Sequence, residues 1–287
     1  MRDLMESDVN EINQRITDSD KKIFKVFESP QISEKDVKDY LPYANSPGYM
    51  VAITPRSGSS YFCDLLAKTG KLGRPNEWIN PNLMPGMLKA RPANNAVQHL
   101  INMRKLTAGV NGLFGIKASF FQFAPMIDTK LDGILFNNFK FIALFRKNIL
   151  MQAISLYIAT ETDVFHTNVQ HAPEKLSKVD SFEYDDETLR EWVRHIYKQE
   201  LEWNKYLVNK SHVTIYYEDL IQNTSAHIGM VSTYLGIPIE TPVNPEDSVF
   251  KKLGFDRSES IYNQFMDNKT NIDMMSELRI SPERYLL

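Results

Sequence analysis

A short run of small, hydroxyl-bearing residues is the part of this sequence best suited to chemistry. Residues 56–60, Arg-Ser-Gly-Ser-Ser, follow the apolar stretch 48–53 and precede a run, 61–66, with the apolar spacing of a helix. A strand-to-helix turn points backbone N–H groups and the positive end of the helix dipole at one place. Small residues let an anion approach, and Arg56 adds a planar cationic group. We predict an anion-binding turn; the alternative is an ordinary turn with a serine N-cap.

The turn differs from the usual site for a nucleoside triphosphate. The Walker pattern ends in Gly-Lys followed by Ser or Thr, whereas this turn offers Gly58, Ser59 and Ser60. No lysine can reach the phosphates from that position. An arginine without a lysine suits an anionic donor that need not be held with Mg²⁺, although a nucleotide kinase-like P-loop enzyme stays an alternative.

Several apolar segments must position this turn. These segments read as strands and are separated by helical patterns, which predicts a parallel sheet covered on both faces. The predicted fold class is therefore α/β. Ligands of such sheets lie beyond the carboxyl ends of the strands, where both Arg56 and Arg146 fall. Asn148 is the predicted N-cap of the helix after Arg146. The expected strands are 48–53, 113–117, 139–145 and 213–217.

Composition places the chain among globular proteins. It has 287 residues, of which 43% are hydrophobic and 24% charged, enough for a sizeable core. The net charge of -3 argues against a nucleic-acid binder that works through general basicity. Cys63 is the single cysteine, which excludes an intrachain disulfide framework and favours a reducing compartment. We find no signal peptide or apolar run of membrane-spanning length, and expect a soluble, cytoplasmic protein.

Two parts of the chain are expected, residues 1–45 and residues 46–287. The first part carries the whole formal charge of -3 and contains an amphipathic helical pattern, which we expect to pack on the main domain. Within the main domain, the segment with Glu77, residues 70–79, should run along the edge of a sheet or of a cleft. Residues 81–95 are expected to form a surface loop, and residues 162–186 a long mobile loop over the site.

Several blocks of the sequence, in order, carry a family resemblance. The motif T-P-R-S-G-S-S-Y-F-C-D-L-L is followed by G-R-P-N-E-W-I, G-I-K, L-F-R-K-N-I-L-M-Q-A-I-S-L-Y-I-A, Y-Y-E-D-L and F-D-R-S-E-S-I-Y. Over roughly residues 48 to 265 these blocks resemble sulfotransferases that use 3′-phosphoadenosine 5′-phosphosulfate (PAPS), and among them most the bacterial trehalose sulfotransferase family. The resemblance implies a P-loop-like three-layer α/β/α sandwich with a central parallel sheet, and a homodimer.

The resemblance also implies roles for individual residues. The 3′-phosphate of the donor would be held by Arg146 and Ser155, and Lys117 and Arg257 match basic positions near the donor. Glu77 falls where the family has its catalytic base, and His166 is the alternative because related cytosolic sulfotransferases use a histidine. The 5′-phosphosulfate would be bound by Arg56, Ser57, Gly58, Ser59 and Ser60.

The chemistry of sulfuryl transfer agrees with these roles. The migrating group is loosely bonded to both oxygens, so catalysis is mainly alignment and neutralisation of the leaving phosphate, which Arg56 can supply. Glu77, partly desolvated beside Trp78, is expected to be the better base for it. We expect no metal, because Glu218 and Asp219 lack a third ligand and suit the first turn of a helix. Trp192 and Trp203 are expected in the core.

Together these features predict an O-sulfotransferase that moves the sulfuryl group of PAPS directly to a hydroxyl. The acceptor expected is a carbohydrate, a glycolipid or a related small molecule. A protein that binds the product 3′-phosphoadenosine 5′-phosphate (PAP) without catalysis is the alternative from another class.

Overall fold

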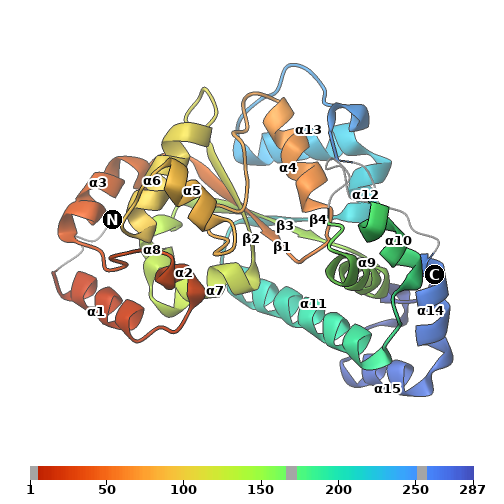
Figure 1. The fold of residues 1–287 in the computed structure, drawn as a ribbon. Helices are drawn as coiled ribbons and strands as arrows, with labels where there is room; N and C mark the ends of the chain where they lie inside the picture. Colours follow the sequence, from red (N-terminus) through yellow and green to blue (C-terminus); the bar gives the residue numbers. More distant parts are fainter. Residues whose placement is uncertain (1–5, 166–172, 251–256) are drawn as a thin grey trace.

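The centre of the molecule is a four-stranded parallel sheet (Figure 1). The computed structural model describes residues 6–165, 173–250 and 257–287. The strand order is β2-β1-β3-β4, which confirms the predicted parallel sheet. The strands at 48–53 and 139–145 have the bounds that the sequence predicts, and the bounds of the other two strands differ from the prediction by one or two residues. The strands are β1 (Gly48–Ile53), β2 (Phe114–Ser119), β3 (Phe139–Phe145) and β4 (His212–Tyr216).

Both faces of the sheet are covered, because its strands are apolar on both sides. On one face Tyr49 and Val51 of β1 pack with α4 (Ser59–Lys68) and α13 (Thr224–Leu235). On the other face Met50 and Ala52 pack with α7 (Phe120–Asp128) and α11 (Asp186–Leu207). Figure 1 shows α4 and α13 above the sheet and α11 below it, so the predicted α/β architecture is confirmed.

A second hydrophobic cluster lies beside the sheet, at the right of Figure 1. It joins α9 (Ile149–Thr162) to α11, and its buried residues include Ile154, Leu189 and Phe265. The other elements of this part are α10 (Pro173–Ser181), α14 (Arg257–Asp267), α15 (Lys269–Glu277) and η2 (Pro282–Arg284). The remaining elements, α12 (Tyr217–Gln222) and η1 (Pro245–Asp247), lie on the side of α4 and α13.

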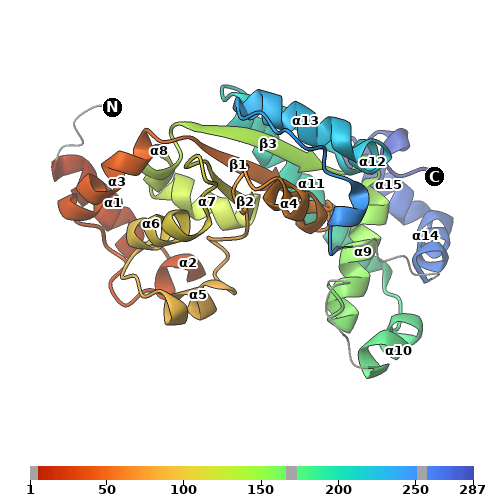
Figure 2. The same cartoon turned by 90° about the horizontal axis from the view of Figure 1, so that it is seen from above.

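The helices within residues 6–45 pack on the main core, as expected of the amphipathic pattern. Val9, Ile12 and Ile16 are buried in the same cluster as residues of β1 and β3. Figure 2 shows these helices grouped beside α6 and α8 at the end of the molecule away from α9. They are α1 (Glu6–Thr17), α2 (Lys22–Lys25) and α3 (Glu34–Ala44), and they lie near α6 (Ala96–Thr107) and α8 (Leu131–Leu135).

Two expected surface loops are partly helical, which corrects the sequence interpretation. Residues 81–95 contain α5 (Met84–Ala90), and residues 162–186 contain α10. Both helices are short and rich in polar residues, Gly or Pro, so their sequences lack a long apolar period. Among the described residues, no helix is long and apolar enough to cross a membrane.

The register of the sheet brings four chain segments to one edge. Ile53 at the end of β1 pairs with Ser119 of β2 and Leu144 of β3, and Leu144 pairs with Ile215 of β4. The segments that follow these strands therefore start side by side, and the candidate site is built from them.

Candidate functional site

The predicted anion-binding turn joins β1 to α4. The Ser57 N–H donates to the Thr54 carbonyl at 3.2 Å, and the helix begins at Ser59. The N-cap residue is Gly58, so the alternative of an ordinary serine N-cap is wrong. Without a capping side chain, the first N–H groups of α4 stay available to an anion. The Ser57 side chain is fully buried, and its Oγ has no hydrogen-bond partner among the described residues.

Gly58 is required by both conformation and space. Its φ of 80° lies in the left-handed region, and a Cβ built there would come within 2.3 Å of the Tyr217 ring. Tyr217 begins α12, directly after β4. The anion turn is therefore packed against the end of β4 at a distance that only glycine permits.

Two buried side chains, one from α9 and one from α11, hold the turn by hydrogen bonds to its backbone and to Thr54. Gln152 of α9 donates to the Thr54 hydroxyl at 2.8 Å and to the Pro55 carbonyl at 2.6 Å. Trp203 of α11 donates from its indole nitrogen to the Ile53 carbonyl at 2.9 Å. Trp203 is fully buried and stacks on Phe123, which confirms its expected place in the core.

Arg56 points along the sheet edge toward α9. Its Nε donates to the Ser155 hydroxyl at 3.2 Å, and its Nη1 donates to the Phe165 carbonyl at 2.5 Å. Burial lowers the pKa of Arg56, and the charge of Arg146 lowers it further. The three predicted residues Arg56, Ser155 and Arg146 thus lie in one place, and the repulsion between the two arginines favours an anion between them.

Arg146 stands at the end of β3, held by residues that follow β4. Its guanidinium carbon lies 5.1 Å from the centre of the Tyr217 ring, and its Nε lies 3.5 Å from Glu218 Oε1. Neither of these two charged atoms makes a hydrogen bond among the described residues, although both are buried. Glu218 and Asp219 lie in the first turn of α12, as predicted, and Asp219 also pairs with Lys147 at 2.5 Å.

Glu77 lies on a segment that follows the free edge of β2, as the sequence predicts. Asn76 forms an isolated parallel bridge with Ile116, and its carbonyl accepts the Lys117 N–H at 3.0 Å. The Lys117 side chain is buried and stands between two groups. Its Nζ lies 3.2 Å from Ser60 Oγ in the anion turn and 3.4 Å from Glu77 Oε1. Lys117 therefore connects the anion turn to the carboxylate.

The other carboxylate oxygen of Glu77 is also hydrogen-bonded. Glu77 Oε2 accepts from Asn80 at 2.6 Å and from Gln122 at 2.8 Å. Burial on its own would raise the pKa of Glu77, but Lys117 and the two amides together hold it below its ordinary value. The expected strengthening of this base by desolvation beside Trp78 is therefore wrong. The structure instead holds Glu77 as a carboxylate.

Gln122, Asn80 and Gln152 are the site residues whose contacts sequence reasoning missed. Gln122 follows Ser119 by three residues, and its Oε1 accepts the Ser119 N–H at 2.9 Å. That spacing marks the start of a helix in the sequence. It gives no sign that the same amide reaches Glu77, because that contact depends on the neighbouring segment.

Not every predicted residue is joined to this cluster. Arg257 begins α14, and its described contacts are with the Phe182 carbonyl at 3.3 Å, the Phe182 ring and Ser260. His166 lies outside the described residues. Trp192 is half-buried against the second hydrophobic cluster, in agreement with a core position. Within the described ranges no group of three or more His, Cys, Asp or Glu residues could hold a metal ion.

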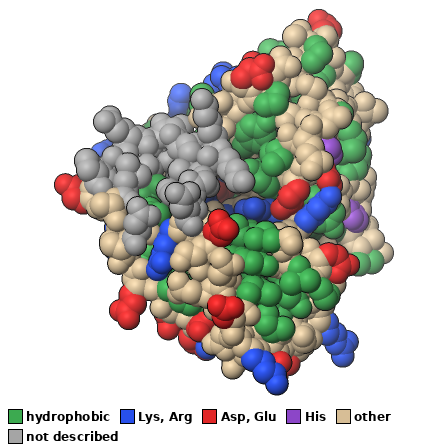
Figure 3. All heavy atoms as spheres, turned by 90° about the vertical axis from the view of Figure 1, so that its right-hand side faces the viewer, with side chains coloured by type: hydrophobic (Ala, Val, Ile, Leu, Met, Phe, Trp, Pro, Cys, Tyr) green, Lys and Arg blue, Asp and Glu red, His purple; other side chains and the backbone are tan. Residues whose placement is uncertain are grey.

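Figure 3 shows the side of the molecule that lies to the right in Figure 1. Basic and acidic side chains lie next to one another near the centre of this face, above a stretch of hydrophobic side chains. The view therefore shows charges of both signs close together on this face.

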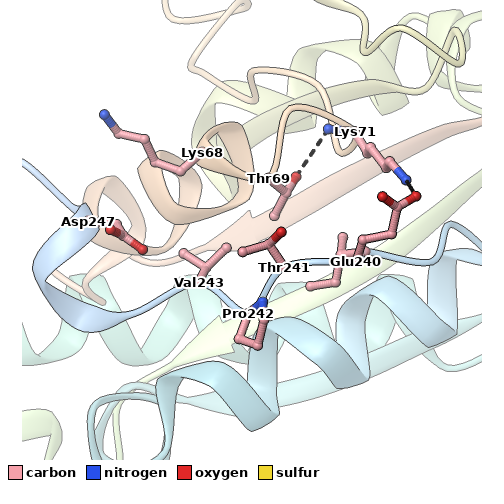
Figure 4. A pocket seen from close by; sticks show the side chains of 9 residues that line it. Lys68, Thr69, Lys71, Glu240, Thr241, Pro242, Val243 and Asp247 are labelled. Carbon is pink, nitrogen blue, oxygen red and sulfur yellow. Dashed lines mark hydrogen bonds and ion pairs between the residues drawn. The ribbon is translucent and has the colours of Figure 1, made fainter.

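A cavity of about 430 Å³ lies at the opposite end of α4 (Figure 4). Lys68, Thr69 and Lys71 line it from the helix end, and Glu240 and Thr241 line it from the segment after α13. Lys71 already pairs with Glu240 at 2.7 Å. The length of α4, roughly 15 Å for its ten residues, separates this cavity from the anion turn. It is therefore not part of the cluster around Arg56 and Glu77.

Solved structures of sulfotransferases are similar to this chain at low sequence identity. One from Alicyclobacillus acidocaldarius is 12% identical, with 82% of this chain and 96% of that chain covered and a TM-score of 0.44. The sulfotransferase domain of the curacin biosynthetic pathway is 13% identical, with 82% and 98% covered and a TM-score of 0.44. A mouse sulfotransferase complexed with PAP is 12% identical, with 82% and 72% covered and a TM-score of 0.39.

The comparison of sequences gives the family directly. No curated protein matches this chain. A family model described as Stf0 sulphotransferase matches residues 48–266, which is well over half of the chain and begins at β1. This match agrees in extent with the sequence blocks quoted above. The chain therefore belongs to the Stf0 sulphotransferase family.

Proposed function

We propose that this protein transfers the sulfuryl group of PAPS to a hydroxyl of a carbohydrate, a glycolipid or a related small molecule, without a metal. One observation carries the proposal. Lys117 Nζ lies within 3.4 Å of both a hydroxyl of the anion turn and the Glu77 carboxylate. A group bound at the turn would thus lie beside a residue that can accept a proton.

The residues around the turn fit a donor with two separate anionic ends. The N-terminus of α4, Arg56 and the unpartnered Ser57 Oγ suit the 5′-phosphosulfate. Arg146 and Ser155 suit the 3′-phosphate, and the buried Nε of Arg146, which pairs with Glu218 at 3.5 Å without a hydrogen bond, is a donor that such an anion could accept from. AMP carries a single phosphate group and would leave one of these two subsites empty.

The reaction needs alignment, charge neutralisation and a proton acceptor. A new bond forms between sulfur and the acceptor oxygen while the bond from sulfur to the bridging phosphate oxygen breaks. Arg56 and the α4 N-terminus neutralise the charge that develops on the leaving phosphate. Glu77 takes the proton of the acceptor hydroxyl. Lys117, which lies between the turn and Glu77, stabilises the negative charge of the sulfuryl group during transfer.

Glu77→Gln separates binding from catalysis. The amide keeps the size of the side chain but cannot take a proton, so PAP should bind with unchanged affinity while transfer is lost. The measurement uses PAPS labelled in its sulfuryl group, a library of glycans and glycolipids, and calorimetry with PAP. Glu240→Gln is the matched control, because Glu240 lies at the distant cavity, and this variant should retain transfer. Asn80→Asp is unsuitable as a control, because it would add a charge beside Glu77.

The results distinguish the parts of the proposal. Transfer retained by Glu77→Gln would remove Glu77 as the base. If the wild-type protein binds PAP but transfers the sulfuryl group to no hydroxyl in the library, a binding protein on this fold would be favoured. Binding of ATP that requires Mg²⁺ and exceeds that of PAP would favour a kinase-like activity.

A further inference from the structure

The C-terminal segment of the chain lies against the turn between β3 and α9. Arg284 of η2 donates from Nη2 to the Arg146 carbonyl at 2.9 Å and from Nε to the Lys147 carbonyl at 3.2 Å. Asn148, the N-cap of α9, donates to the Leu286 carbonyl at 3.3 Å. Three consecutive residues of the turn are therefore tied to residues near the end of the chain.

The guanidinium of Arg284 is itself fixed by a buried carboxylate. Nη1 and Nη2 donate to the two oxygens of Glu200 at 2.6 and 2.9 Å, which is the bidentate geometry that arginine favours. The Glu200 side chain is only 8% exposed and belongs to α11, the helix that also carries Trp203. Burial would lower the pKa of Arg284, but Glu200 raises it, so the pair stays charged.

The pair of Arg284 and Glu200 holds residues that form one end of the candidate site. The turn carries Arg146 directly, and α9, which starts at its end, carries both Ser155 and Gln152. The guanidinium of Arg146 is oriented by Tyr217, whereas its backbone is held by Arg284. A shift of the turn would therefore move Arg146 and α9 relative to the anion turn.

We propose that Arg284, fixed by Glu200, is a positioning residue for recognition of the second phosphate of the donor. The inference rests on the proposed function, because it assigns that phosphate to Arg146 and Ser155. Arg284 does not contact the donor; it sets the position of the main chain from which Arg146 extends. Its loss should weaken binding of a nucleotide with a 3′-phosphate more than binding of one without it.

Calorimetry with PAP and AMP on Arg284→Ala, Arg284→Lys and Glu200→Gln tests this inference. The ratio of PAP affinity to AMP affinity should fall by about tenfold or more in Arg284→Ala, which corresponds to about 1.4 kcal/mol. Arg284→Lys should give an intermediate ratio, since an ammonium can still pair with Glu200 but lacks the planar fork. Arg194→Ala, which removes an exposed arginine of α11, is the matched control and should leave the ratio unchanged.

Each outcome decides between a positioning and a merely structural role. Equal losses of PAP and AMP affinity, with an unchanged ratio, would overturn the inference. If Arg284→Ala does not fold, the ratio of PAP affinity to AMP affinity is measured on Arg284→Lys and Glu200→Gln instead. Thermal unfolding is recorded for all variants. A wild-type protein that binds PAP and AMP equally would contradict the proposed function, whereas a wild-type preference for PAP that every variant keeps contradicts the inference alone.

Discussion

Glu77 is the residue that we propose as the proton acceptor, and its neighbours decide its charge. Lys117, Gln122 and Asn80 keep its pKa below the ordinary value of 4.5 although burial acts in the opposite direction. Because the pKa in the folded protein is lowered, ionised Glu77 stabilises the fold above about pH 4.5. This contribution is lost as the pH falls through the lowered pKa. The carboxylate is therefore ready to accept a proton at neutral pH, and its low pKa limits its strength as a base.

Lys117→Met should raise the pKa of Glu77, because burial would then be opposed only by the two amides. The acidic limb of the profile of kcat/KM against pH should move upward by about one unit or more. Lys71→Met removes a half-buried lysine that pairs with Glu240 far from Glu77, and it should leave the limb in place. An unmoved limb in Lys117→Met would show that Glu77 does not control the rate.

At the residue scale, sequence alone identified groups but not their contacts. Arg56, Arg146, Ser155 and Lys117 follow from the turn, the strand end and the family resemblance, and the structure brings them together. The state of Glu77 could not be predicted, because it depends on amides that reach it across segments far apart in the sequence.

At the scale of elements, the turn between β1 and α4 depends on Gly58. Gly58→Ala combines left-handed strain with an overlap on Tyr217, so it should lower the free energy of unfolding by about 2–4 kcal/mol. Gly70→Ala is the matched control, since Gly70 has a φ of 68° but open space around it. It should cost about 1 kcal/mol. Urea denaturation measures both, and equal losses would contradict the requirement for close packing against Tyr217.

The elements were predicted well where their apolar pattern was strong. Strand β1 is a continuous apolar run and β3 is apolar except for Lys140, and the predicted bounds of both agree with the structure. The sequence predicts loops where α5 and α10 form, because α5 contains Pro85 and Gly86 and α10 is mostly polar. Their helical form depends on the surfaces they pack against.

At the scale of the whole molecule, the N-terminal helices are part of the core. Asp36 of α3 is buried and accepts hydrogen bonds from the Ser33 N–H at 2.8 Å, Asn95 at 3.1 Å and Gln98 at 2.8 Å. The last two belong to the start of α6 or its N-cap, so Asp36 fastens the N-terminal helices to the main domain.

Asp36→Ala should therefore lower the free energy of unfolding by about 2–3 kcal/mol, since it removes the acceptor of the hydrogen bonds from Ser33, Asn95 and Gln98 in a mostly buried network. Asp39→Ala, on the same helix, removes an exposed pair with Lys35 and should change it little. Urea denaturation and limited proteolysis of the first 45 residues measure the effect. Equal stability of the two variants would mean that this network does not attach the helices.

The central claim is that two partly buried arginines, Arg56 and Arg146, bind a donor with phosphate groups at its 5′ and 3′ positions. Calorimetry of the wild-type protein and of Arg146→Met with PAP and with AMP tests it most directly. We predict that the wild-type protein binds PAP at least about tenfold more tightly than AMP, and that Arg146→Met loses this preference while it still binds AMP. Equal binding of PAP and AMP by the wild-type protein, or no binding of PAP, would contradict the account.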